Sequence, residues 1–254
     1  MSVPQELFDE SHCELCACGA GLDFSISFAF QPIVDAETRT VFAYEALVRG
    51  EQGEPAGEVL GRVHNANRYA FDQVCRVRAV KLASRLGMTA RLSINFLPNA
   101  VYRAEYCIRT TLAAAQHYNF DTSRIIFEVT EGEALTSKEH LLSILASYQQ
   151  MGFSVALDDF GAGYNRFDVL MDTPPDLLKL DMMLIRNIEQ HPKSQAVVDG
   201  LLLTCRRLGV QVVAEGIETE AEYDWLRERG VRLFQGYLFS RPAFEQLPEV
   251  YIPR

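Results

Sequence analysis

The sequence has no apolar run close to the roughly 18 residues that a membrane-spanning helix needs. It also has little positive charge, with 24 lysines and arginines against 34 acidic residues and a net charge of -10. This balance argues against broad electrostatic binding to duplex nucleic acid or to an anionic membrane. The first ten residues, MSVPQELFDE, lack the basic and apolar regions of a secretion signal. We therefore expect a cytoplasmic protein that binds neither membranes nor duplex nucleic acid.

Cysteine is sparse along most of the chain. Three cysteines stand alone in segments that look helical: Cys75, Cys107 and Cys205. Without an export signal, these are expected to be reduced thiols in the core. Three more lie beside a histidine near the start of the chain, in HCELCACG: His12, Cys13, Cys16 and Cys18. The cysteines of this stretch could bind Zn²⁺, but a structural zinc site usually draws on two separated ligand pairs. The simpler interpretation is a cysteine-containing leader over residues 1–22.

Apolar runs of strand length are the main feature of the rest of the chain. There are eight of them: SISFAFQPIV, VFAYEALV, RLSINFL, RIIFEVTE, SVALDDF, LLKLDM, VQVVAEGI and LFQGYLF. Only DAETRT joins the first two, which is too short for a crossover helix and predicts an antiparallel hairpin. Helical stretches such as Glu139 to Met151 and Gln195 to Leu208 separate most of the others. This order predicts an α/β fold, a (β/α)8 TIM-like barrel with an antiparallel first strand, as one domain over residues 23–254.

Every one of these runs carries a polar side chain near its end. They are Gln31, Glu45, Asn95, Glu128, Asp158, Asp159, Lys179, Asp181, Glu215 and Gln235. A single polar residue at a strand end is usually a cap or a loop anchor. In a barrel, however, the strand ends converge on the mouth where barrel enzymes keep their active sites. A polar residue on every run therefore predicts a functional site there.

The composition of this set indicates metal binding. Six members offer hard oxygen ligands: Glu45, Asn95, Glu128, Asp158, Asp159 and Glu215. Such ligands suit Mg²⁺ or Mn²⁺, and the absence of imidazole and thiol from the set argues against zinc. The adjacent carboxylates of Asp158 and Asp159 repel each other unless a positive charge lies between them, which a pair of divalent cations would supply. Two such cations can drive an in-line displacement at phosphorus, so phosphodiester hydrolysis follows.

Three residues have two interpretations each. Lys179 lies within an apolar strand, and it could orient the attacking water or form a structural salt bridge to Asp181 or Glu215. Glu215 could bind the second metal or accept the proton of the water. Arg49, four residues after Glu45, could clamp a substrate phosphate or form an ordinary surface ion pair. The glycines of DFGAGY allow the tight turning expected of a mobile lid over the site.

Several short motifs carry a resemblance to a known family. In chain order they are QPIVD, EALVR, SIN with a following Pro98, FEVTE, DDFGAGY, KLD, AEGIET and QGYLFSRP. From about Phe24 to Phe244 the chain resembles the EAL domain family, bacterial phosphodiesterases that hydrolyse cyclic di-GMP to linear pGpG with Mg²⁺ or Mn²⁺. The resemblance also implies a homodimer and leaves open a regulatory sensor partner.

The resemblance assigns roles to residues of this chain. It implies metal ligands at Glu45, Asn95, Glu128, Asp158 and Asp159. It places Glu215 near the second metal, often as general base, and gives Lys179 the positioning of water. It implies substrate contacts at Gln31, Arg49, Asp181 and Gln235. It implies that Glu131 anchors the lid loop and that Glu218, the second acid of the EGIET stretch, also supports that loop. The chain departs from the family pattern at three positions: Leu97, Asn165 and Arg166.

Three functions compete at this stage. The first is an active phosphodiesterase. The second is a non-catalytic cyclic di-GMP receptor or protein-interaction module on the same fold, which family members reach by losing metal ligands. The third is another metal-dependent barrel enzyme, such as a sugar-phosphate enzyme, which explains the joint order of the motifs poorly. Because no ligand is missing from this chain, we expect the phosphodiesterase.

Overall fold

The computed structural model describes residues 22–101, 103–130, 137–162 and 167–253. Within these ranges one sheet closes on itself in the order β2-β3-β4-β5-β6-β7-β8-β1, with β1 paired back to β2. Its strands are β1 (Ile26–Asp35), β2 (Thr40–Gly50), β3 (Arg91–Phe96), β4 (Ile125–Thr130), β5 (Ser154–Phe160), β6 (Leu177–Leu180), β7 (Gln211–Ala214) and β8 (Leu233–Gln235). The TIM-like barrel expected from the sequence is confirmed.

The first strand runs against its neighbours. β1 pairs antiparallel with β2, where Gln31 lies opposite Glu45, and antiparallel with β8, where Ile33 lies opposite Gln235. Every other neighbouring pair from β2 to β8 is parallel. The predicted hairpin is therefore confirmed. A short strand that the sequence analysis did not predict, β9 (Ala243–Phe244), pairs with β1 beyond the end of β8 and continues the sheet there.

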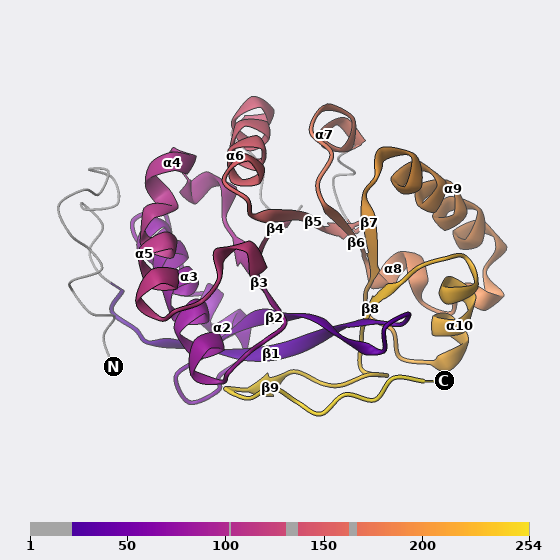
Figure 1. The fold of residues 1–254 in the computed structure, drawn as a ribbon, viewed down its shortest axis with the longest axis horizontal. Coiled ribbons are helices and arrows are strands. Elements are labelled where there is room, and N and C mark those ends of the chain that lie inside the picture. The colour runs from indigo at the N-terminus through magenta and orange to yellow at the C-terminus, as the bar shows by residue number, and fades with distance from the viewer. Residues whose placement is uncertain (1–21, 102, 131–136, 163–166, 254) are drawn as a thin grey trace.

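Helices flank most of the barrel, while β1, β2 and β9 run along its lower edge in the view of Figure 1. They are α2 (Ala56–Leu60), α3 (Arg68–Arg85), α4 (Ala104–Cys107), α5 (Arg109–His117), α6 (Lys138–Gln150), α7 (Phe167–Asp172), α8 (Met182–Ile185), α9 (Pro192–Leu208) and α10 (Glu220–Glu228). The two helices predicted by residue range correspond to α6 and α9. Helix α9 begins at a proline and ends before Gly209, whose φ of 74° closes the last turn in the left-handed region. Among the described helices, none has the length and apolar character needed to cross a bilayer.

The barrel interior consists of an apolar layer next to a polar one. Its apolar side chains form one buried cluster: Ile33, Ala43, Ile126, Ala156, Leu177, Val213 and Leu233. Each of them lies two residues from a polar side chain predicted for the site, and alternate residues of a strand point to the same face. A larger core fills the space between the strands and the helices. The strand sequences therefore look almost continuously apolar, because both faces of the sheet are buried.

A buried ion pair fixes the outer side of the barrel near β3. Arg76 is 0% exposed; it pairs with Asp72 at 2.8 Å and donates to the hydroxyl of Tyr148 at 2.8 Å. Asp72 also accepts a hydrogen bond at 3.0 Å from the amide of Leu97, the residue after β3. One helix side chain thus holds the chain where it leaves the strand that carries Asn95. Leu97 itself is partly buried and packs against the main core.

The three isolated cysteines are buried in the core, in α3, α4 and α9, as predicted: Cys75, Cys107 and Cys205. The cysteine-containing leader and its candidate zinc ligands, Cys13, Cys16 and Cys18, lie outside the described residues, as do Glu131, Asn165 and Arg166. Their predicted roles stay predictions.

Candidate functional site

Lys179 of β6 lies at the centre of the barrel mouth and is 1% exposed. Its Nζ lies 2.8 Å from Glu128 Oε2, 2.9 Å from Asp158 Oδ1, 2.8 Å from Glu215 Oε1 and 3.5 Å from Glu45 Oε2. The pairing with Glu215 that the sequence left open is present, and the alternative pairing with Asp181 is not formed. A buried lysine is costly without partners, and here four carboxylates face it.

Amide and hydroxyl groups orient two of these carboxylates. Asn95 Nδ2 donates to Glu45 Oε1 at 2.8 Å, and Gln235 Nε2 donates to Glu45 Oε2 at 2.8 Å. Ser93 Oγ donates to Glu128 Oε1 at 2.5 Å. Glu45 lies opposite Ser93 in the register of β2 and β3, and Asn95 lies opposite Glu128 in that of β3 and β4. Strand register therefore places this part of the site.

Asp158 and Asp159 end β5 in an unusual backbone conformation. The pairing of β5 with β6 shifts register between Leu157 and Phe160, and Asp159 has a φ of 55°. Its amide donates to Asp158 Oδ1 at 2.9 Å. A side chain in the left-handed region costs free energy, and such strain is commonly kept at functional positions. The turn allows both neighbouring carboxylates to face the mouth.

The carboxylates form two overlapping groups that fit divalent cations. The first contains Glu45, Glu128 and Asp158, the second contains Asp158, Asp159 and Glu215, and in each the candidate ligand atoms lie within 4.8 Å of one another. All of these donors are hard oxygens, which suit Mg²⁺ or Mn²⁺. Asp158 belongs to both groups, so the arrangement matches a two-metal site with a bridging carboxylate.

The carboxyl groups of the mouth are buried close together, and their mutual repulsion shifts their pKa values. Burial and the nearby Glu45 raise the pKa of Glu128 well above its ordinary value, and burial and Asp158 do the same for the pKa of Glu215. Burial together with Asp158 raises the pKa of Asp159 to about 6. Burial alone would lower the pKa of Lys179, but the surrounding carboxylates raise it well above its ordinary value. One ammonium group therefore does not balance the charge of all these carboxylates, and a bound cation would lower their pKa values.

Two cavities border this cluster. An apolar groove of about 330 Å³ is bounded at the cluster by Asn95 and Asp158 and walled by Ala46, Leu47, Leu60, Phe71, Phe96 and Leu97. A more polar one of about 240 Å³ contains Glu45 and Glu215, and four residues with predicted roles also line it: Gln31, Asp181, Glu218 and Gln235. The site thus opens toward an apolar surface and toward a polar one.

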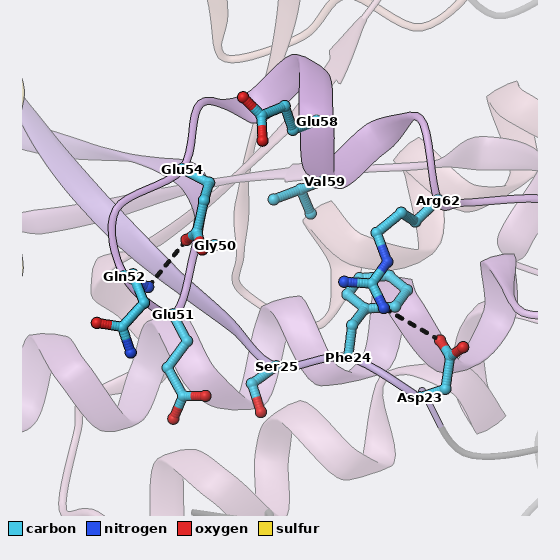
Figure 2. Close-up of a pocket in the computed structure, with 10 residues that line it drawn as sticks. All are labelled: Asp23, Phe24, Ser25, Gly50, Glu51, Gln52, Glu54, Glu58, Val59 and Arg62. Carbon is cyan, nitrogen blue, oxygen red and sulfur yellow. Dashed lines mark hydrogen bonds and ion pairs between the residues drawn. The ribbon is translucent and has the colours of Figure 1, made fainter.

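Another pocket lies away from the predicted site residues, where β1 begins and β2 ends (Figure 2). Arg62 lies over the ring of Phe24, 4.1 Å from its centroid, and pairs with Asp23 at 3.7 Å. The acidic residues that line this pocket are exposed, and none of them belongs to the two carboxylate groups of the barrel mouth.

Three predicted residues have local partners. Arg49 donates from Nη1 to the carbonyl of Val48 at 2.7 Å, and within the described ranges no ion pair joins it to a carboxylate. Asp181 caps α8 by accepting from the amide of Met183 at 2.8 Å. Glu218 pairs with Arg186 at 2.9 Å.

Two groups around the site were not predicted from the sequence. Ser93 lies two residues before Asn95 on the same face of β3, a spacing that could have identified it. Glu222 is 1% exposed and forms a capping box with Thr219. The spacing of Thr219 and Glu222 is the sequence signature of that box.

Comparison with known proteins identifies the family. The family model described as "EAL domain" matches residues 23–242, and the chain therefore belongs to the EAL domain family. The blue light- and temperature-regulated antirepressor BluF of Escherichia coli K12 is 30% identical over 246 residues, which cover 96% of this chain and 61% of BluF. The cyclic di-GMP phosphodiesterase PdeR of the same strain is 34% identical over 229 residues, 84% of this chain and 34% of PdeR. The chain thus spans only part of the length of these two relatives.

Solved structures show the same fold. A standalone versatile EAL protein from Vibrio cholerae O395, in its c-di-GMP-bound form, superposes with a TM-score of 0.88 and 48% identity, covering 91% of this chain and 98% of that one. BlrP1 of Klebsiella pneumoniae, in a manganese and cyclic di-GMP complex, gives a TM-score of 0.82 and 34% identity over 89% of this chain and 58% of that one.

Proposed function

We propose that this protein is a cyclic di-GMP phosphodiesterase that uses two Mg²⁺ or Mn²⁺ ions to form linear pGpG. The observation that carries the proposal is the pair of carboxylate groups sharing Asp158 at the barrel mouth. The relatives named as cyclic di-GMP phosphodiesterases and the neighbouring structures with the dinucleotide support the choice of substrate.

The proposed roles follow from the contacts. Glu45, Asn95, Glu128 and Asp158 would hold one cation, and Asp158, Asp159 and Glu215 would hold the other. Bound cations would polarise the phosphate and acidify a nearby water. Attack of water on phosphorus forms one P–O bond and breaks the ester bond to the 3′ oxygen. One proton of the water would pass to Glu215, the 3′ oxygen would take up a proton from solvent as it leaves as a hydroxyl group, and Lys179 would orient the water.

The two cavities suggest how a dinucleotide is held. The apolar groove beside Asn95 and Asp158 would receive one purine base against the walls formed by Leu47 and Leu60. The polar cavity would hold the remaining ribose and phosphate groups against Gln31, Asp181 and Gln235. Arg49 would turn from the carbonyl of Val48 to a substrate phosphate.

A second function has one specific observation in its favour. The relative BluF is named an antirepressor, and a chain of this family could bind the dinucleotide or another protein without cleaving it. The complete set of carboxylates and the buried Lys179 favour hydrolysis.

The assembly and location of the protein are also proposals. We propose a homodimer in the cytoplasm, where the cyclic dinucleotide acts as a bacterial second messenger. Light scattering on the purified protein would test the dimer. A monomer at all concentrations would contradict it.

The direct test is incubation of the purified protein with cyclic di-GMP and Mn²⁺, with the products separated by chromatography. We expect linear pGpG in Mn²⁺ or Mg²⁺ and none in EDTA. Binding of the dinucleotide without pGpG in Mn²⁺ would establish the receptor instead. Absence of both binding and cleavage would contradict both functions.

A further inference from the structure

The residues that follow β7, 215–219, are hydrogen-bonded to the two strands that flank β7. The amide of Glu215 donates to the carbonyl of Leu180 at 3.1 Å. The amide of Ile217 donates to the carbonyl of Gln235 at 3.0 Å. These bonds extend the pairing of β7 with β6 and with β8 beyond Ala214. Side chains outside the sheet hold the same segment through further contacts.

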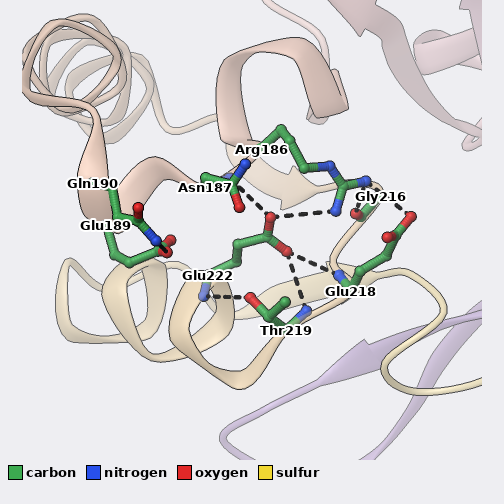
Figure 3. Close-up of polar contacts among 8 residues, drawn as sticks. All are labelled: Arg186, Asn187, Glu189, Gln190, Gly216, Glu218, Thr219 and Glu222. Atoms are coloured by element: carbon green, nitrogen blue, oxygen red, sulfur yellow. Dashed lines mark hydrogen bonds and ion pairs between the residues drawn. The ribbon is translucent and has the colours of Figure 1, made fainter.

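The carboxylate of Glu222 accepts hydrogen bonds from residues of two loops (Figure 3). It accepts from the amides of Asn187 at 2.9 Å, Glu218 at 3.0 Å and Thr219 at 3.2 Å. It also accepts from Arg186 Nη1 at 3.3 Å. Because Glu222 is almost completely buried, these donors account for its charge, and it joins the loop after α8 to the segment after β7.

Arg186 also contacts Gly216, the residue that follows Glu215. Its Nη2 donates to the carbonyl of Gly216 at 3.2 Å and to Glu218 Oε1 at 2.9 Å (Figure 3). Gly216 has a φ of +67°, and a Cβ there would lie 2.5 Å from Met182 Cβ. The peptide after Glu215 thus has a left-handed conformation at Gly216, where a side chain would collide with α8, and its carbonyl is held by the guanidinium group of Arg186.

We propose that Arg186, oriented by Glu222, is a positioning residue that sets the carboxylate of Glu215 in the group with Asp158 and Asp159. The inference rests on the proposed function, because that group matters only as the second cation site. Glu215 belongs to this group and not to the group of Glu45 and Glu128. Loss of Arg186 should therefore weaken one cation site and leave the other unchanged.

The test compares Arg186→Gln with the wild type. The three backbone bonds to Glu222 remain in this variant, so α10 keeps its cap and the fold is retained. The matched control is Arg227→Gln, which breaks an exposed ion pair with Asp224 at 3.3 Å on α10. Calorimetric titration with Mn²⁺ alone reports both sites. Melting temperature and steady-state hydrolysis of cyclic di-GMP are measured on the same samples.

For Arg186→Gln we expect about tenfold weaker binding of one Mn²⁺ ion, unchanged binding of the other, and about tenfold lower kcat with little change in KM. Its melting temperature should match that of the control. Arg186→Lys keeps one charge but cannot reach all three acceptors, so it should fall between the wild type and Arg186→Gln.

Distinct results separate the two levels of the argument. A wild type that binds no Mn²⁺ or forms no pGpG refutes the proposed function, and the positioning role falls with it. An active wild type whose Arg186→Gln variant keeps both affinities and kcat overturns the positioning role alone. Equal weakening of both sites, or the same loss in Arg227→Gln, would also overturn it, because the effect would then be general.

Discussion

Lys179 Nζ and Glu128 Oε2 lie 2.8 Å apart, both buried, on β6 and β4. These strands are not neighbours, so the pair spans the inside of the barrel above β5. The ammonium group offsets part of the negative charge of the surrounding carboxylates. The cation-free site is therefore stabilised by the same lysine that we propose acts on the water.

Replacing this lysine should separate its two roles. Without cations, Lys179→Ala leaves the buried carboxylates unpaired, and we expect a loss of about 3 kcal/mol in the free energy of unfolding at neutral pH. Mn²⁺ should restore much of this stability, while turnover stays far below that of the wild type. Urea denaturation with and without Mn²⁺, together with hydrolysis rates, measures both effects. Equal turnover in the two proteins would remove the lysine from the mechanism.

Glu45 accepts from Asn95 and Gln235 and belongs to the first carboxylate group. In Glu45→Gln the amide removes a charge from that group and places a donor beside two other donors. Affinity for Mn²⁺ and turnover should fall together, and turnover should fall by about 100-fold or more. Calorimetry and product chromatography test this, with the exposed Glu58→Gln as control. Full activity without the first cation would contradict the assignment.

The pH dependence of cation binding should follow Asp159, whose pKa is raised to about 6. Only the ionised carboxylate binds a cation, so protons compete below that pH and affinity for Mn²⁺ should fall about tenfold per unit for one proton. Titrations across this range, with Asp159→Asn as control, measure the effect. An affinity that does not change with pH would show that Asp159 is not a ligand.

The same shift has a consequence for folding. A carboxyl whose pKa is higher in the folded protein than in the unfolded chain binds more protons when folded between those two values. For Asp159 the stability of the cation-free protein should therefore decrease as the pH rises from about 4 to about 6. The raised pKa values of Glu128 and Glu215 act in the same direction. Melting curves in EDTA check the sign, and Mn²⁺ should remove the dependence.

The apolar groove can be tested at its exposed wall. Leu60 is 47% exposed, so Leu60→Asp should fold normally while placing a charge where we propose that a purine base lies. We expect KM for cyclic di-GMP to rise about tenfold, with affinity for Mn²⁺ unchanged. Steady-state kinetics and calorimetry distinguish the two. An unchanged KM would place the base elsewhere.

Two glycines offer a matched pair for stability. A Cβ at Gly236 would collide with the backbone of Ile217, whereas a Cβ at Gly200, inside α9, would meet nothing within 4 Å. Gly236→Ala should therefore destabilise the fold and displace the segment that carries Glu215. Gly200→Ala should stabilise it by about 0.5 to 1 kcal/mol. Urea denaturation of both variants tests the contrast, and equal effects would contradict it.

Much of the barrel and the composition of its mouth could be predicted because strand order and alternation are local properties of the sequence. The short DAETRT connection required a hairpin, and polar residues at successive strand ends required a shared edge. The partners of Lys179 could not be chosen, since they depend on how far opposite strands tilt across the barrel. The capping role of Asp181 and the turn of Arg49 toward its own backbone are set by loop geometry that no periodicity records. β9 is too short to carry a strand pattern.

The reversed first strand affects how the chain can reach its fold during synthesis. β1 is paired on one edge with β2, which follows at once, and on the other with β8 and β9, which emerge from the ribosome some two hundred residues later. A nascent chain therefore holds an open sheet edge for most of its translation, and such edges invite pairing with other chains. The carboxylate-rich mouth is assembled last, since Glu215 and Gln235 arrive with the segments that close the sheet.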